Sequence, residues 1–282
     1  MATILKDTET VRFVEADLTY LLPSSEKPSV QTSAGRVADS PDRTGEFAQR
    51  RIPVFDGRPF ASQFSLDQEG FEFHQHRTSV TDFLDDDAVR TGYYPEVERL
   101  VKKATGAADV FIFDHTVRIE ADGKREDKGR RAPVQIIHND YTEKSGPIRV
   151  RELLPPDKAD AYLAGRFAQV NVWRSIGAPV QTTPLAISDA QTIAPQDLVA
   201  TDLVYGDRTG EIYQLHYNPA HNWFYFPDMT RDEVLLLKGY DSTTDGTARF
   251  TAHSAFTNPD APEDAAPRES IEVRTFVSFG PD

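Results

Sequence analysis

The sequence predicts an α+β fold that is mainly β, because short strand-like runs fill most of the chain after residue 108 and helical periodicity is limited to two places. Loops rich in Gly, Pro, Asp and Asn separate the runs, and many short strands with such turns are typical of a sandwich or barrel. The runs lie at 109–113, 134–138, 167–173, 202–205, 211–217, 223–226, 233–237, 248–255 and 270–279.

Helical patterning is strongest between Ser79 and Thr105, where apolar residues recur mostly at three- and four-residue spacing. Pro95 suits the first turn of a helix, so a second helix is expected to open at this point. A shorter helical pattern covers residues 156–165. Residues 21–55, by contrast, are rich in Ser, Pro, Gly and Arg, which predicts an extended arm or surface loop.

These patterns predict a single domain over residues 1–282, with no internal repeat or low-complexity tract. We expect residues 1–60 to form an N-terminal arm and loops and residues 61–108 to form a mainly helical segment. Residues 109–282 then form the β core. A chain of this length can bury a sizeable hydrophobic core.

Charge and composition restrict the partners and the metal ligands. With 45 acidic and 31 basic residues, the net charge of -14 repels polyanions, so we expect no nucleic acid and no anionic membrane as partner. The absence of cysteine leaves His, Asp and Glu as the strong metal ligands. The N-terminus shows no basic region followed by an apolar stretch, so we expect a cytoplasmic protein.

The first candidate site is the segment His138-Asn139-Asp140, directly after an apolar run. Residues two apart on a strand project to one face, so His138 and Asp140 can present a nitrogen and an oxygen to one point while Asn139 turns away. This pair alone is also typical of a solvated turn. His253 alternates with apolar neighbours on a late predicted strand and suits the third position. Two histidines and one carboxylate leave coordination positions open on a metal for dioxygen and a cosubstrate.

An arginine and a serine follow His253 at the start of the last predicted strand. Arg268 and Ser270 share one face there, and their guanidinium and hydroxyl groups can hold the far carboxylate of a dicarboxylate. A lysine cannot make the same planar contact. Arg274 has the same parity as Arg268 and is the alternative anion contact.

The order HxD, distal His and RxS resembles the Fe(II)/2-oxoglutarate-dependent oxygenases that have a double-stranded β-helix core of the jelly-roll, cupin-like type. The sequence is similar in particular to the subgroup with the cephamycin 7α-hydroxylase component, gibberellin desaturase-like proteins and the novofumigatonin endoperoxidase. The resemblance covers roughly residues 60–279 and is most specific over 233–274. The segments that carry it are 94–97, 113–118, 138–142, 171–174, 184–186, 221–229, 238–242, 253–256 and 268–274.

The resemblance implies a jelly-roll core with flanking helices and one Fe(II) held by His138, Asp140 and His253. It implies that 2-oxoglutarate chelates this iron and meets Arg268 with its far carboxylate, and that O2 is the other cosubstrate. Decarboxylation to succinate and CO2 then drives hydroxylation or desaturation of a small, largely apolar molecule of secondary metabolism. Ring formation and endoperoxidation are further outcomes of the same chemistry. The protein supplies placement and exclusion of water.

Further polar residues are weaker candidates, and each has a structural explanation as well. Ser270, Gln135, Asn171 and Arg274 are candidate cosubstrate contacts or supports of the ligands. His221 competes with His253 as the third metal ligand, although it lies in a predicted loop. The candidate substrate contacts are His115, Arg118, Tyr141, Arg174, His221 and Trp223.

Two other classes of function remain open on the sequence. One is a non-catalytic jelly-roll protein that binds a small ligand, and the intact set of ligand residues argues against it. The other is a hydrolase or isomerase that uses zinc or manganese on the same three ligands, and Arg268 argues against it. Symmetric dimers are the commonest oligomers, so a homodimer is the default expectation.

Overall fold

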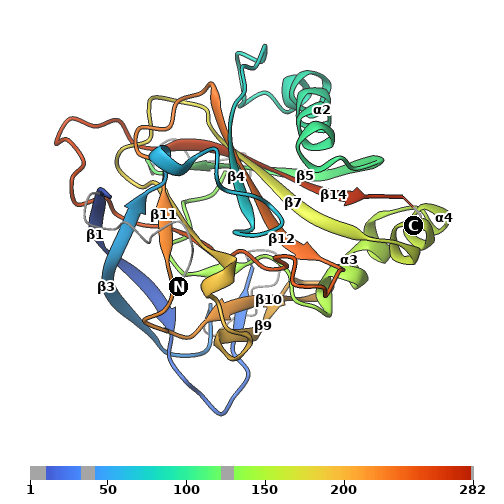
Figure 1. Ribbon diagram of the computed structural model, residues 1–282, viewed down its shortest axis with the longest axis horizontal. Coiled ribbons are helices and arrows are strands. Elements are labelled where there is room, and N and C mark those ends of the chain that lie inside the picture. The colour runs from blue at the N-terminus through green and yellow to red at the C-terminus, as the bar shows by residue number, and fades with distance from the viewer. Residues whose placement is uncertain (1–10, 33–41, 122–129, 281–282) are drawn as a thin grey trace.

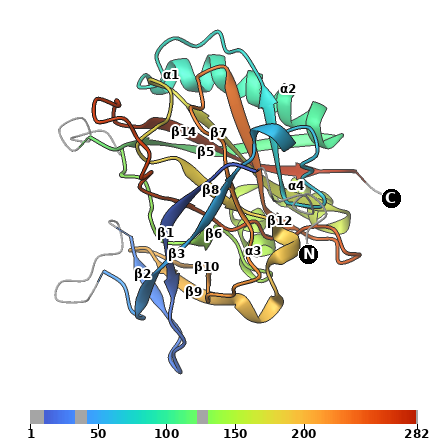
Figure 2. The same ribbon diagram turned by 60° about the vertical axis from the view of Figure 1, so that its left-hand side comes forward.

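Two curled sheets face each other in the computed structural model, which describes residues 11–32, 42–121 and 130–280 (Figures 1 and 2). The nine-stranded sheet has the order β1 (Phe13–Leu21), β3 (Phe47–Asp56), β11 (Trp223–Tyr225), β8 (Leu185–Ser188), β13 (His253–Ala255), β6 (His138–Asn139), β10 (Thr209–Leu215), β9 (Leu198–Val204) and β2 (Ser29–Gln31). The five-stranded sheet has the order β4 (Phe71–Gln75), β12 (Glu233–Asp241), β7 (Phe167–Ser175), β14 (Glu269–Ser278) and β5 (Asp109–Ile119). This confirms the predicted double-stranded β-helix core.

Few helices accompany the sheets. They are α1 (Asp86–Ala88), the π-helical turn η4 (Val89–Tyr93), α2 (Tyr94–Thr105), α3 (Ser145–Leu153) and α4 (Pro156–Ala164), with short 3-10 turns η3 (Arg58–Phe60), η6 (Ala190–Thr192) and η7 (Pro195–Asp197). The two predicted helices near 95 and 156 are confirmed as α2 and α4. Gly106 ends α2 with a left-handed φ of 72°, as glycine does at many helix ends. Helix α3 lies outside the segments that were predicted to be helical.

The N-terminal part differs from the prediction of an arm with loops for residues 1–60. Strands β1 and β3 pair antiparallel from end to end and belong to the nine-stranded sheet. Alternate residues of β1 are buried, which is the period of a strand with one covered face. Strand β4 likewise interrupts the segment 61–108, which was predicted to be mainly helical. Residues 1–10 and 33–41 of the predicted arm lie outside the described residues.

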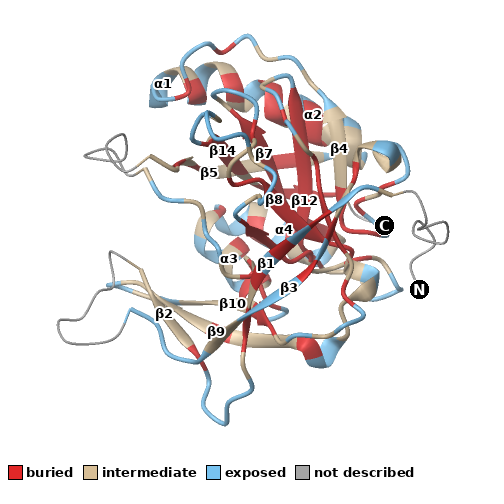
Figure 3. Cartoon of the chain, turned by 90° about the vertical axis from the view of Figure 1, so that its left-hand side faces the viewer, coloured by how far each residue is buried: buried red, intermediate tan, exposed pale blue. Residues whose placement is uncertain are grey.

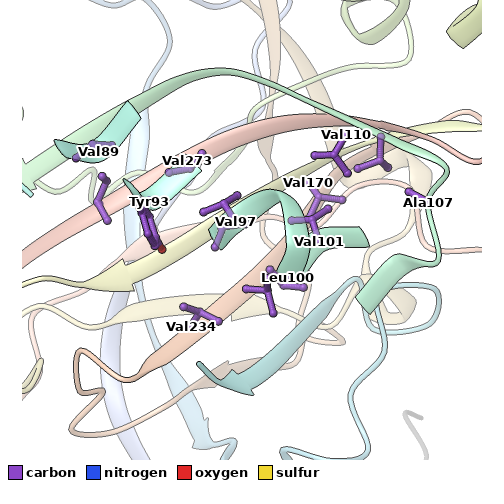
Figure 4. Packing of buried hydrophobic residues seen from close by; sticks show 14 of the residues in the cluster. Val89, Tyr93, Val97, Leu100, Val101, Ala107, Val110, Val170, Val234 and Val273 are labelled. Carbon is purple, nitrogen blue, oxygen red and sulfur yellow. The ribbon is translucent and has the colours of Figure 1, made fainter. Parts of the chain in front are cut away.

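Helix α2 covers the outer face of the five-stranded sheet. Val97 and Val101 of the helix pack with Val170 of β7 and Val273 of β14, and none of the four is exposed (Figure 4). All nine residues of β7 are buried, so both of its faces are covered (Figure 3). Because side chains alternate along a strand, the residues of β7 and β14 between these valines point to the inside of the fold.

Among the described residues, no helix is both long enough and apolar enough to cross a membrane.

Gly70 joins the two sheets at a point where a side chain does not fit. Its φ is +86°, and a Cβ there would lie 2.0 Å from Thr251 Oγ1. We expect Gly70→Ala to lower the free energy of unfolding by about 2–4 kcal/mol, because a left-handed backbone and overpacking each cost energy. Gly106→Ala is the matched control, since its φ is +72° and no atom lies within 4 Å of its Cβ position. Urea unfolding of both variants measures the difference, and equal losses would contradict the steric argument.

Candidate metal centre

Three ligand-bearing side chains meet at one point inside the fold. His138, Asp140 and His253 each bring one ligand atom to within 4.8 Å of the others, and this is the only such group of three in the part of the chain that the structure describes. His138 of β6 pairs directly with His253 of β13, and their ring centroids lie 4.6 Å apart. Pairing within the sheet therefore brings these two histidines together, although they lie far apart in the sequence.

Backbone carbonyls fix the orientation of both imidazoles. His138 Nδ1 donates to the Ile136 carbonyl at 2.8 Å, and His253 Nδ1 donates to the Thr251 carbonyl at 3.3 Å. Because a carbonyl only accepts, each Nδ1 carries the proton and each Nε2 is left with a free lone pair. His138 Nε2 lies 3.7 Å from Asp140 Oδ1. Two nitrogens and one carboxylate oxygen thus converge as metal ligands require.

The electrostatics keep His138 and Asp140 in the protonation state that binds a metal. Burial and the neighbouring His253 lower the pKa of His138 to about 4, so its ring is neutral at pH 7. Burial by itself raises the pKa of Asp140, but Arg274 and the two histidines outweigh burial and hold this pKa below its usual value. Metal ions compete with protons for such ligands, and here no proton has to leave His138 or Asp140 at neutral pH.

The second oxygen of Asp140 is held by residues of the five-stranded sheet. Asn171 Nδ2 donates to Asp140 Oδ2 at 2.8 Å, and Arg274 Nε lies 3.7 Å from the same oxygen. Gln169 Nε2 donates to Asn171 Oδ1 and so fixes the direction of the Asn171 amide. This arrangement leaves Asp140 Oδ1 to face the histidines.

A cavity extends from the two histidines to a buried arginine. His138 and His253 line it together with the polar residues Arg118, Arg268 and Glu272 and the apolar or aromatic residues Val134, Trp173, Leu185 and Ala255. The lining comes from both sheets and from the loop before β6. Two of the three candidate metal ligands and the candidate anion contact therefore share one cavity, which the sequence alone did not show.

The surroundings of Arg268 suit an anionic ligand. Arg268 is 2% exposed; its Nε donates to Ser270 Oγ at 3.1 Å and its Nη1 donates to the Thr183 carbonyl at 2.8 Å. Burial and the nearby Arg118 lower the pKa of Arg268 to about 9. Trp173 Nε1 and Thr183 Oγ1 are buried and have no hydrogen-bond partner among the described residues. Buried polar atoms are almost always paired, and Trp173 lines the cavity, so its Nε1 fits a bound carboxylate.

Comparisons with known proteins agree with this geometry. A family model described as an oxidoreductase/YMDC permease-like domain matches residues 18–278. The chain is 34% identical over 274 residues to the Fe(II)/2-oxoglutarate-dependent dioxygenase nvfI of Aspergillus novofumigatus, and the match covers 91% of this chain and 96% of that protein. The chain belongs to the Fe(II)/2-oxoglutarate-dependent dioxygenases. It is thus an oxidoreductase of a family whose cofactors are Fe(II), 2-oxoglutarate and O2.

Further relatives of this dioxygenase have related activities. The alpha-ketoglutarate-dependent dioxygenase phiK of a fungal species is 30% identical over 279 residues, with 94% of this chain and 96% of that protein covered. A hydroxylase/desaturase of Cercospora beticola, CTB9, is 32% identical over 253 residues, with 82% and 77% covered. The solved structure of the iron and alpha-ketoglutarate-dependent endoperoxidase NvfI has a TM-score of 0.86 at 30% identity and covers 95% of this chain and 98% of that chain. These matches do not favour the alternative of a binding protein or of a hydrolase.

The structure brings several of the predicted site residues of the dioxygenase together. Arg268 and Ser270 contact each other beside the cavity, and Arg118 lines it. Asn171 contacts Asp140 and lies away from Arg268. Arg274, the alternative anion contact, pairs with Asp114 at 2.9 Å and with Glu272 at 3.0 Å, and its Nε lies 3.7 Å from Asp140 Oδ2.

Other predicted residues lie away from the cavity. Gln135 is exposed to solvent. Arg174 and His115 point to the opposite faces of their strands, where Arg174 Nε donates to Tyr93 Oη at 2.8 Å and His115 Nδ1 pairs with Tyr94 Oη at 2.9 Å. Both residues were predicted to line the site, although each lies on the same face of its strand as neighbours that point outward.

Two aromatic candidates belong to the hydrophobic core, and His221 is a buried polar residue. Tyr141 packs with Phe276. Trp223 is fully buried, and its Nε1 donates to Tyr20 Oη at 2.8 Å. His221, the rival third ligand, has both nitrogens occupied: Tyr20 Oη lies 3.3 Å from its Nδ1, and Asp197 Oδ2 lies 3.1 Å from its Nε2. The structure therefore does not place His221 in the metal centre.

Two cavity residues with polar side-chain atoms, Trp173 and Glu272, were not predicted from the sequence. Trp173 lies two positions after Asn171, and Glu272 lies two positions after Ser270. Side chains alternate along a strand, so Trp173 and Glu272 point to the inside of the fold, as Arg268 and Ser270 do. The alternation of side chains along these strands could therefore have predicted both residues.

Metal binding distinguishes the two candidate histidines. We expect His253→Ala to abolish tight binding of Co(II), used as a substitute for Fe(II), because one of three ligands is removed. His221→Ala should keep the affinity of the wild type while it lowers the free energy of unfolding by about 1–3 kcal/mol, since Asp197 loses a buried partner. Calorimetric titration with Co(II) and urea unfolding of both variants provide the test. Metal binding that survives in His253→Ala and disappears in His221→Ala would reverse the assignment.

Proposed function

We propose that this dioxygenase binds one Fe(II) through His138, Asp140 and His253 and hydroxylates or desaturates a small, largely apolar molecule of secondary metabolism. The observation that carries the proposal is the convergence of three ligand atoms within 4.8 Å beside a cavity that His138 and His253 line together with Arg268. Two histidines and a carboxylate with open positions are the ligand set of non-haem Fe(II) oxygenases. Fe(II) and 2-oxoglutarate supply the oxidising power when they are bound.

Arg268 is the proposed contact of the far carboxylate of 2-oxoglutarate. Ser270 and the Thr183 carbonyl use its Nε and one hydrogen of Nη1, so the remaining guanidinium hydrogens are free to donate to a carboxylate. The Arg268 guanidinium lies 5.0 Å from the Trp173 ring, which supports its plane. Trp173 lines the same cavity, and its Nε1 is a further donor to the proposed anion site.

The remaining cavity wall favours an apolar substrate. Val134, Leu185 and Ala255 line it, and Val134 is 37% exposed, which puts an apolar side chain where the cavity meets solvent. These side chains exclude water and offer no hydrogen bond to a polar substrate. Relatives named hydroxylase/desaturase, among them CTB9, efuI and asaB, support hydroxylation or desaturation as the outcome.

Substitution of Arg268 tests the cosubstrate contact. We expect Arg268→Lys to raise the 2-oxoglutarate concentration needed for half-saturation about 10–100-fold, because the planar charge-assisted contact is lost. The Fe(II) affinity should stay close to that of the wild type. An anaerobic titration of the Fe(II) protein with 2-oxoglutarate, followed by the visible charge-transfer absorption, measures this. If Arg274→Lys shifts the titration and Arg268→Lys leaves it unchanged, the cosubstrate contact is Arg274.

The two tryptophans of the chain provide a matched pair. Trp173→Phe keeps an aromatic ring under Arg268 and removes the indole N–H, so we expect the affinity for 2-oxoglutarate to fall about 2–10-fold. Trp223→Phe removes the indole N–H that bonds Tyr20 and should lower stability without changing this affinity. The same anaerobic titration compares the two variants. Equal 2-oxoglutarate affinities in Trp173→Phe and the wild type would remove Trp173 from the anion site.

A further inference from the structure

We propose that Asn139 and the β-bulge at Gly239 form a positioning unit, which fixes the HxD segment relative to His253 and thereby sets the metal affinity. Neither Asn139 nor Gly239 supplies a ligand atom. The proposal rests on the metal site proposed above. It assigns a role to Asn139, the residue between the two ligands, for which the sequence predicts only a side chain that points away from the metal.

The Asn139 amide is fully buried and uses all of its donors. Its Nδ2 donates to the Tyr141 carbonyl at 2.6 Å and to the Gly239 carbonyl at 2.8 Å. Its Oδ1 accepts from the Thr251 N–H at 3.1 Å. Asn139 is 0% exposed, so water does not replace these bonds if the side chain is removed.

The bond to Thr251 connects Asn139 to the other ligand segment. The carbonyl of Thr251 orients His253 through its Nδ1, and Thr251 Oγ1 donates to the Gly70 carbonyl at 3.0 Å. Strands β6 and β13 share a single register pair, His138 with His253. So short a ladder fixes the two segments weakly, and the Asn139 amide supplies a second connection between them.

Gly239 supports the same segment from the opposite sheet. The register between β12 and β7 shifts between Lys238 and Tyr240, which makes Gly239 the extra residue of a bulge. Bulges of this kind change the direction of a strand locally, and here the Gly239 carbonyl meets the Asn139 amide. The HxD segment is thus tied to both sheets at the residue between its two ligands.

The missing side chain of Gly239 has a second effect on the site. A Cβ at this position would lie 2.1 Å from Gln169 Oε1. Gln169 is fully buried and donates to Asn171, which in turn donates to Asp140 Oδ2. A methyl group at Gly239 therefore displaces Gln169 and disturbs the amide chain that fixes Asp140. Gly239 acts on one ligand segment through its carbonyl and on Asp140 through the space it leaves.

The experiment compares Asn139→Ala and Gly239→Ala with Val101→Ala, a control in the core between α2 and the outer face of the five-stranded sheet. Co(II) is titrated into each full-length protein without 2-oxoglutarate, and both the affinity and the visible Co(II) spectrum are recorded. Thermal unfolding of the metal-free proteins is measured alongside. We expect Asn139→Ala and Gly239→Ala to lower the Co(II) affinity about 10–100-fold and to change the spectrum, as loss of ligand-orienting contacts does. Val101→Ala should lower the Tm and keep the affinity and spectrum of the wild type.

The possible results separate this proposal from the proposed function. Wild-type affinity and spectrum in both site variants overturn the positioning role while the iron site stands. An equal loss of affinity in Val101→Ala also overturns it, because affinity then follows general stability. If Asn139→Ala does not fold, Gly239→Ala and Asn139→Ser decide by the same criteria. A wild-type protein that binds no Co(II) overturns the metal site itself and this proposal with it.

Discussion

The pairing of β6 with β13 is the contact on which the site depends. It places His138 opposite His253 and so turns a large sequence separation into neighbouring imidazoles. The contact is short, because β6 has two residues and β13 has three. Long-range pairing of such short strands needs support from tertiary contacts. The facing five-stranded sheet provides it through buried amides, so the metal centre is built between two sheets rather than on one.

Charge balance explains why so many ionisable groups can be buried at this place. Asp140 faces Arg274, which also pairs with Asp114 and Glu272, so each of these charges has a partner. Arg268 differs, since burial and Arg118 both disfavour its charge and lower its pKa. A buried guanidinium in that state is stabilised by an added anion. The candidate site thus has one region that favours a cation, next to Asp140, and one that favours a carboxylate, next to Arg268.

Local patterns predicted the parts of the site that depend on local geometry. Strand alternation placed His138 with Asp140 and Arg268 with Ser270, and helical periodicity with Pro95 located α2. The predictions went wrong where long-range partners decide the outcome. His221 is held by Tyr20 and Asp197, and β1 and β3 are strands because they pair with each other, although their composition suggested an arm. The predictions for Arg174 and His115 were wrong for a different reason. Strand alternation already predicts that both side chains point to the face of the sheet that the helix covers, and this was not applied to them.

The division of the cavity also explains how close relatives can carry out different oxidations. Fe(II) and 2-oxoglutarate bring the same oxidising power to each member of the family, and the protein determines which bond of the substrate lies next to the metal. In this chain Arg118, Arg268 and Glu272 form the charged part of the cavity wall, whereas Val134, Leu185 and Ala255 form the apolar part. If Arg268 holds the cosubstrate as proposed, changes in the charged part affect cosubstrate binding and therefore every outcome alike. Changes in the apolar part reorient the substrate and leave the cosubstrate in place. Selection between hydroxylation and desaturation is therefore expected to depend on these apolar side chains.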